Sequence, residues 1–217
     1  MRYRHRFTPA AVALLGLAAA CSDQSSTVGP DAAGFSRPSL GAVRTTASGQ
    51  FVFTVDPTKN ETFVFIGEHK IVFPANSICD PATSSYGPTE WDQPCTPAAQ
   101  PITMYADTAT VNGHPYIRFS PDLRFVPSAD PKAWVMLYMK DASAADPLVA
   151  PTLDILWQTA DGSLIDETLA DPTLATQVQG SSSIVYRRLK HFTGYLVVTG
   201  YAQPADASAT LEASVMP

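Results

Sequence analysis

Short runs of β-branched and aromatic residues, each bounded by a turn signal, most limit how this chain can fold. The runs are 50–56, 61–67, 69–75, 101–107, 115–120, 133–140, 153–158, 163–168, 182–189 and 194–201. Nineteen prolines interrupt the chain, and a proline inside a helix removes a hydrogen bond and clashes with the preceding turn. The pattern predicts an all-β fold, a single antiparallel β-sandwich domain over residues 49–202.

Two turn signals indicate how neighbouring runs connect. The stretch DPTKN (56–60) separates the first two runs and predicts that they form a hairpin. Asp161-Gly162 separates the runs 153–158 and 163–168, and Asp-Gly is a strong signal for a tight hairpin. One segment, 166–178, has a composition that allows a helical turn.

The amino terminus has the pattern of an export signal. Arg2, Arg4 and Arg6 precede the uncharged apolar run 10–20, which is shorter than the ~20 residues that a membrane-spanning helix needs. This arrangement predicts a secretory signal peptide over residues 1–20.

The residue that follows the signal is a cysteine, Cys21, preceded by small residues. Signals of bacterial lipoproteins are cut in this setting and the cysteine then carries lipid, so we expect lipidation at Cys21. Leu17 lies four places before the cysteine, whereas the usual lipoprotein signal has leucine three places before it. Ordinary cleavage after Ala20, with Cys21 unmodified, therefore stays open as the alternative.

The regions flanking the expected sandwich lack periodicity. Residues 21–48 are rich in Ser, Gly, Ala, Thr and Pro, which is typical of a flexible tether behind a lipidated cysteine. The tail 203–217 is polar and rich in alanine, and we expect it to be loosely ordered.

Cysteine usage supports export. If Cys21 is acylated, Cys79 and Cys95 are the two that remain, and in an oxidising compartment they can form a disulfide. The bridge would close a loop that carries Tyr86 and Trp91. An aromatic loop of this kind is a candidate binding surface for a protein or a glycan. The alternative is that the disulfide only stabilises a long insert without regular structure, and that the insert binds nothing.

Charge and side-chain spacing exclude several classes of function. The formal charge is −6, and it becomes more negative once a signal with three arginines is removed. Nucleic-acid binding needs a basic surface, so we expect no nucleic-acid partner. The sequence has no paired-cysteine or His-x-x-x-His spacing for a metal, no glycine-rich phosphate loop and no G-x-S-x-G motif, so we expect no metal or cofactor.

Three blocks of the sequence resemble the ZU-five-type domain, the β-sandwich of ankyrins, netrin receptors and zonula occludens proteins. They are HKIVFPANSI (69–78), PYIRFSPDLRFVPSADPKAWVMLYM (115–139) and HFTGYLVV (191–198), in the order that the family has. The insert 77–95 departs from the family pattern. The resemblance implies a β-sandwich carried by a bacterial lipoprotein, without an assigned activity.

The tripeptide His191-Phe192-Thr193 resembles a self-cleavage site. Some relatives of this architecture cut themselves at His-Phe-Ser, and the autoproteolytic domain of adhesion receptors does so at His-Leu-Thr. By this resemblance Thr193 would be the nucleophile, Phe192 the carbonyl donor and His191 the base, and the cut would follow an N-to-O acyl shift. The alternative is that the tripeptide begins a strand and only packs, and Gly194 would relax the strain that such a reaction uses.

From the sequence we therefore expect a non-catalytic interaction or structural module, anchored in the membrane of a bacterial cell envelope by lipid at Cys21 and facing the periplasm or the exterior. The alternative function is a domain that cleaves itself between Phe192 and Thr193.

Overall fold

The computed structural model of the chain describes residues 39–65 and 67–201. The expected signal peptide 1–20, the lipidation site Cys21 and the tail 203–217 lie outside the described residues. Within the described ranges, no helix has the length and apolar character needed to cross a membrane.

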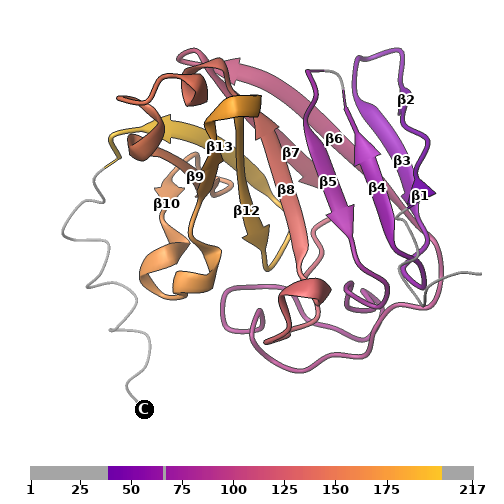
Figure 1. Ribbon diagram of the computed structural model, residues 1–217. Coiled ribbons are helices and arrows are strands. Elements are labelled where there is room, and N and C mark those ends of the chain that lie inside the picture. The colour runs from indigo at the N-terminus through magenta and orange to yellow at the C-terminus, as the bar shows by residue number, and fades with distance from the viewer. Residues whose placement is uncertain (1–38, 66, 202–217) are drawn as a thin grey trace, which may run out of the picture. The chain divides into compact units, whose positions relative to one another are not determined.

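The first of two sheets runs in the order β1-β4-β5-β8-β12-β11 (Figure 1). Its strands are β1 (Ser39–Leu40), β4 (Glu61–Val64), β5 (Lys70–Phe73), β8 (Val135–Lys140), β12 (Ile184–Leu189) and β11 (Gln177–Gln179). The edge strand β1 is parallel to β4, and the remaining pairs in this sheet are antiparallel.

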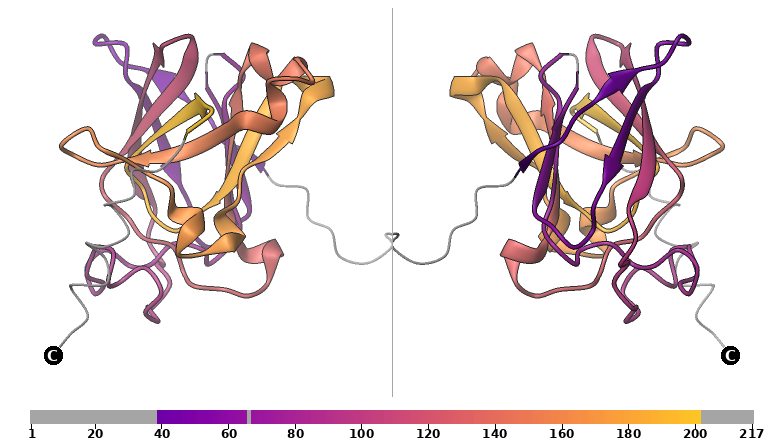
Figure 2. Two further views of the ribbon diagram at one scale, coloured as in Figure 1. Left: turned by 90° about the vertical axis from the view of Figure 1, so that its left-hand side faces the viewer. Right: turned by 90° about the vertical axis from the view of Figure 1, so that its right-hand side faces the viewer.

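The second sheet runs in the order β10-β9-β13-β7-β6-β3-β2, and all of its described pairs are antiparallel. Its strands are β2 (Arg44–Thr45), β3 (Phe51–Val55), β6 (Ile102–Val111), β7 (His114–Ser120), β9 (Leu153–Gln158), β10 (Leu164–Ile165) and β13 (Gly194–Thr199). Figure 2 shows the two sheets as the layers of a β-sandwich. The predicted all-β sandwich is confirmed.

Short 3₁₀ turns connect the strands. They are η1 (Pro131–Ala133), η2 (Ala142–Ala145), η3 (Ala150–Thr152), η4 (Glu167–Leu169), η5 (Pro172–Leu174) and η6 (Gly180–Ser182). Asp166 and Asp171 cap η4 and η5 by accepting a hydrogen bond from the backbone two residues on. The helical turns expected within 166–178 are therefore these two 3₁₀ turns.

The core forms because alternate residues of each strand point between the sheets. In β3, for example, Phe51, Phe53 and Val55 are buried while the residues between them are not. Phenylalanines dominate the core and mostly touch edge to face or tilted, as between Phe53 and Phe63, whose ring centroids lie 4.5 Å apart.

One predicted hairpin is wrong and another is confirmed. β3 and β4 lie in different sheets, so the turn 56–60 carries the chain from one layer to the other. The segment 153–165 does form a hairpin, in which β9 pairs with β10 and Gly162 takes the left-handed backbone, φ 88°, that the tight turn requires.

Part of the segment expected as a tether takes part in the sheets. β1 pairs with β4, and β2 pairs with β3, although both short strands lie before residue 49. Edge pairing uses backbone groups, so a polar, aperiodic sequence can take part in it.

Candidate functional site

The tripeptide 191–193 forms the link between β12 and β13, and its backbone is tied on both sides. The Phe192 N–H donates to the carbonyl oxygen of Leu123 at 2.7 Å. The Thr193 carbonyl oxygen accepts from the Phe119 N–H at 2.9 Å. The bond between Phe192 and Thr193 is therefore held between two anchored peptide groups.

The Phe192 side chain is fully buried in the aromatic core. Its ring stacks on Phe119 with centroids 4.4 Å apart and meets Phe73 and Phe125 edge to face at 5.8 and 5.0 Å. This packing fixes the residue whose carbonyl faces the site.

His191 is also fully buried, and one of its ring nitrogens has a carboxylate partner. Nε2 lies 3.0 Å from Oε1 of Glu167, the first residue of η4. The other carboxylate oxygen, Oε2, accepts from the Arg187 guanidinium at 2.8 Å. Burial raises the pKa of Glu167, but the hydrogen bond to His191 and the charge of Arg187 outweigh burial, so the pKa lies below its ordinary value. Glu167 is therefore an acceptor-only carboxylate.

The Arg187 guanidinium supplies the positive charge that stabilises the buried Glu167 carboxylate. The side chain points inward from β12 and has no exposed surface. Besides Glu167, it donates to the carbonyl oxygens of Ile155 at 2.6 Å and Arg188 at 3.1 Å. A buried guanidinium is costly unless it is paired and hydrogen-bonded, and these three bonds give each of its three nitrogens an acceptor.

The tautomer of His191 follows from its partners. An ionised carboxylate cannot donate, so Nε2 carries the proton that is shared with Glu167. In the neutral ring, Nδ1 is then an acceptor. Nδ1 lies 3.5 Å from the Thr193 hydroxyl oxygen, at the long end of a hydrogen bond, and 3.3 Å from the Tyr86 hydroxyl oxygen. Glu167, His191 and Thr193 thus have the order of an acid–base–nucleophile triad.

The insert between β5 and β6 covers this triad, and its disulfide, Cys79–Cys95, is present as predicted. Trp91 of the insert is buried and lies flat on the His191 ring, with centroids 3.6 Å apart and planes 12° apart. Trp157 of β9 meets the same imidazole edge to face at 5.1 Å. The two indoles therefore fix the plane of the imidazole.

Tyr86, the second aromatic residue expected on a binding surface, has a partly exposed ring and an inward-pointing hydroxyl. The ring is 37% exposed, and its hydroxyl donates to the Phe192 carbonyl oxygen at 2.6 Å. Burial raises the pKa of the Tyr86 phenol far above its ordinary value, so the hydroxyl stays protonated.

Charged residues close to the tripeptide in space or in sequence hold the second half of the insert. The Arg124 guanidinium donates to the carbonyl oxygens of Glu90 and Gln93, each at 2.6 Å. Lys190, which directly precedes the tripeptide, pairs with Asp92 at 2.7 Å. The insert is thus attached to the residue that precedes the tripeptide and to Arg124, the bridge partner of His191.

Gly194 is needed for packing rather than for backbone freedom. Its φ lies outside the left-handed region, and a Cβ placed on it would come within 2.6 Å of the Tyr116 hydroxyl oxygen. The expectation that Gly194 relaxes strain at the tripeptide is therefore not supported by an unusual backbone conformation at this residue.

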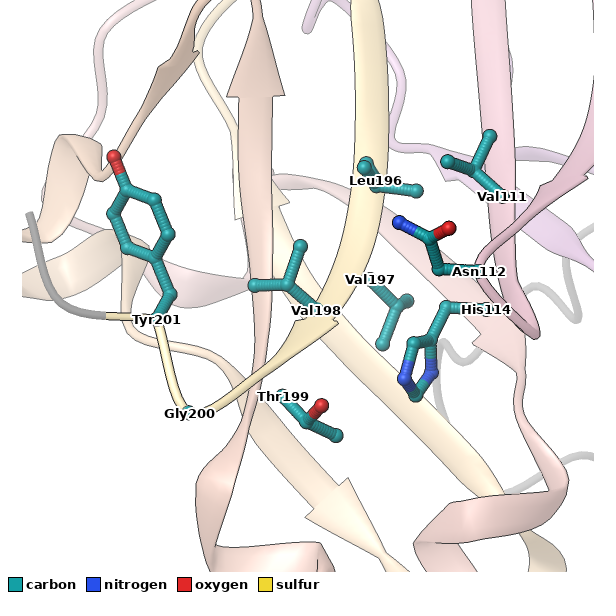
Figure 3. Close-up of a pocket in the computed structure, with 9 residues that line it drawn as sticks. All are labelled: Val111, Asn112, His114, Leu196, Val197, Val198, Thr199, Gly200 and Tyr201. Atoms are coloured by element: carbon teal, nitrogen blue, oxygen red, sulfur yellow. The ribbon is translucent and has the colours of Figure 1, made fainter.

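A pocket in the described part of the molecule lies at the far end of β13 from the tripeptide. It has a volume of about 370 Å³ and is lined by Asn112, His114 and residues 196–201, together with Val111 (Figure 3). A smaller pocket, of about 120 Å³, adjoins Tyr86 and includes Ser84, Asp122 and Arg124. Tyr86 is the residue of the candidate site that lines this smaller pocket, whereas the tripeptide 191–193 does not line it.

The other two histidines in the described part of the chain, His69 and His114, each have one hydrogen-bond partner rather than a cluster of metal ligands. His114 pairs with Asp141 at 2.7 Å, and His69 accepts from the Lys140 backbone at 3.1 Å. Among residues 39–65 and 67–201 there is no group of three or more His, Cys, Asp or Glu side chains that could hold a metal ion.

Sequence reasoning missed Glu167, Arg187 and Trp157. Glu167 lies 24 positions before His191, and nothing in the sequence marks it among the other acids. The one available signal was chemical, because a buried catalytic histidine needs an acceptor to fix its tautomer.

Comparison of the chain with protein-family models, with curated proteins and with solved structures gives no match.

Proposed function

We propose that this protein is an exported domain that cleaves its own chain between Phe192 and Thr193. The observation that carries the proposal is the position of His191, which has Glu167 on Nε2 and the Thr193 hydroxyl on Nδ1. The resemblance of residues 191–198 to the closing strand of ZU-five-type domains gives independent support, because some relatives of that architecture are cut at the corresponding position.

The reaction needs only groups of this chain and water. Nδ1 of His191 takes the proton of the Thr193 hydroxyl as Oγ1 attacks the carbonyl carbon of Phe192. The C–N bond then breaks, the proton passes to the Thr193 nitrogen, and an ester joins Phe192 to Oγ1. Water hydrolyses the ester, leaving a carboxylate on Phe192 and restoring the Thr193 hydroxyl. Glu167 stabilises the positive charge that His191 carries between these steps.

The cut piece, residues 193–217, would stay bound. β13 lies between β7 and β9 and pairs with both through its backbone, and Tyr195 and Val197 are buried in the core. Separation of the two pieces therefore requires unfolding.

We propose further that the domain is held at the membrane of a bacterial cell envelope by lipid on Cys21. The Cys79–Cys95 disulfide supports an extracytoplasmic location, because such bonds persist in oxidising compartments. Export of the chain and labelling of Cys21 with a radioactive fatty acid test this part, and a Cys21→Ala variant is the control.

A second candidate function is the non-catalytic module expected from the sequence, which interacts with a protein or glycan. Its support is the packing of Phe192 among Phe73, Phe119 and Phe125, which gives the tripeptide a purely structural use. This candidate requires an intact chain.

Intact mass after denaturation decides between the two. The wild-type chain is expected to give two masses that divide at Thr193, and Thr193→Ala a single mass. Thr193→Ser should still be cut because it keeps a hydroxyl, and Thr199→Ala, an exposed change in the same strand, serves as the matched control. A single wild-type mass, unchanged by hydroxylamine, which attacks esters, would refute self-cleavage and favour the interaction module.

A further inference from the structure

The part of the insert that the disulfide closes, residues 79–95, brings one hydroxyl group to the bond that the proposed function cuts. Tyr86 Oη lies 2.6 Å from the Phe192 carbonyl oxygen. We propose that Tyr86 is a catalytic residue, whose O–H stabilises the negative charge that develops on this oxygen when Thr193 attacks. The inference rests on the proposed self-cleavage and adds to it a group from outside the His-Phe-Thr tripeptide.

The direction of the Tyr86 hydrogen bond follows from counting protons. A carbonyl oxygen only accepts, so the single hydroxyl proton of Tyr86 points to Phe192. That proton is then not available to Nδ1 of His191, which lies farther away, at 3.3 Å. The lone pair of Nδ1 is left for the Thr193 hydroxyl. The Tyr86 hydroxyl thus polarises the Phe192 carbonyl and leaves Nδ1 of His191 able to act as the base.

The donor stays protonated and its surroundings are held in place. Burial raises the pKa of the Tyr86 phenol, so the proton remains on the oxygen throughout the neutral range. The edge of the ring packs against Trp91, which itself lies flat on His191. A donor that is oriented before the reaction stabilises a developing oxyanion without a cost of reorganisation at that moment.

The insert is built to hold this tyrosine. The disulfide closes the loop at its base, Arg124 fixes Glu90 and Gln93, and Lys190 fixes Asp92. The anchoring residues, Arg124 and Lys190, lie beside the tripeptide: Arg124 forms an isolated β-bridge with His191, and Lys190 precedes it. The residues that hold the insert therefore border the reacting groups directly.

The donor is also the only tyrosine hydroxyl that the described contacts place on the Phe192 carbonyl oxygen. Tyr195, which is fully buried, donates instead to the His191 carbonyl oxygen at 2.6 Å. Tyr195 therefore fixes the peptide group one residue before the cut, whereas Tyr86 contacts the group that reacts.

The test follows cleavage of the full chain by pulse-labelling in an exporting bacterium, since Met216 marks the carboxy-terminal piece. Tyr86→Phe removes only the hydroxyl and is expected to slow cleavage by about 10²–10³-fold, the usual effect of losing one oxyanion donor. The control is Tyr105→Phe, an exposed position on β6, with an expected rate equal to wild type. Melting temperatures of both variants show whether the fold is kept.

A second readout separates donation from packing. Incorporation of 3-fluorotyrosine at position 86 keeps the ring and makes the phenol more acidic, so the hydrogen bond to a developing oxyanion strengthens and cleavage should accelerate. An unchanged or slower rate with the fluorinated residue, or a Tyr86→Phe chain cut as fast as wild type, overturns the role of Tyr86 and leaves the proposed self-cleavage standing. A wild-type chain that stays whole, even in hydroxylamine, overturns both.

Discussion

Replacement of Glu167 by glutamine tests whether the buried chain of charges supports both folding and the proposed reaction. The change keeps the shape of the side chain but leaves the Arg187 guanidinium, which has no exposed surface, without a counter-charge. Removing one partner of a buried ion pair costs about 3–5 kcal/mol. Arg187 keeps its bonds to two backbone carbonyls, so we expect a loss near the lower end, about 3 kcal/mol in the free energy of unfolding.

Urea denaturation at pH 7 measures this loss, and two variants sharpen it. Glu68→Gln breaks a surface pair with Lys140 and should cost less than about 1 kcal/mol. Adding Arg187→Met to Glu167→Gln removes the unpaired charge and should restore about 1–2 kcal/mol. A Glu167→Gln chain as stable as the Glu68→Gln chain would refute the reasoning.

The same substitution separates stability from chemistry. Glutamine cannot stabilise a positively charged imidazole as a carboxylate does, so cleavage should slow by about 10²–10⁴-fold in Glu167→Gln. Cleavage should stay slow in the double variant, in which Arg187→Met restores stability.

Low pH should also remove the contribution of Glu167 to stability. Folding lowers the pKa of Glu167, so its stabilising effect is complete above its ordinary pKa and disappears as the pH falls through the folded value. The difference in stability between wild type and variant should therefore shrink in acid.

Three other perturbations test the forces around the site. Replacing both Cys79 and Cys95 by serine should lower the free energy of unfolding by about 3 kcal/mol, measured in urea, because the bridge closes a short loop; an unchanged midpoint would contradict this. Phe192→Ala should cost about 3–5 kcal/mol by calorimetry, since the ring is fully buried, and a loss below about 1 kcal/mol would show that the core refills. Burial raises the pKa of Asp171, but hydrogen bonds, chiefly from Lys190, outweigh it and lower the pKa to about 2. Its stabilising effect, about 1–2 kcal/mol, should thus be complete above pH ~4 and be lost towards pH 2, and Asp171→Asn should remove that part of the pH dependence.

The longer strands of this fold could be predicted from sequence, but the short strands β1, β2 and β11 and the assignment of strands to sheets could not. The predicted runs 101–107 and 194–201 overlap β6 and β13, because residue types and turns mark them locally. Whether β3 pairs with β4 or with β6 depends on how the layers close, which a turn of five residues does not reveal. Alternation specifies which side chains are buried, and both sheets of a sandwich bury the same kind of side chain.

The candidate site was predictable only where its residues are adjacent in the chain. The tripeptide could be identified because three neighbours carry the nucleophile, the carbonyl and the base. Glu167 could not, because it lies on the 3₁₀ turn η4, 24 positions before His191, and only the fold brings the two side chains together. Tyr86 and Trp91 were noticed as aromatic residues of a stapled loop, yet the direction in which they point is a property of the folded insert.

The insert departs from the ZU-five-type pattern that we propose for this chain, and its position gives a physical reason for its presence. A His-aromatic-Thr sequence at the start of a strand has only its own three residues to work with. Here Trp91 covers the imidazole, Tyr86 contacts the carbonyl, and the disulfide limits how far either can move. Exclusion of water strengthens each hydrogen bond in the site, so a loop that covers the tripeptide increases the effect of groups already present. The departure from the family pattern and the candidate chemistry therefore lie at the same place in the fold.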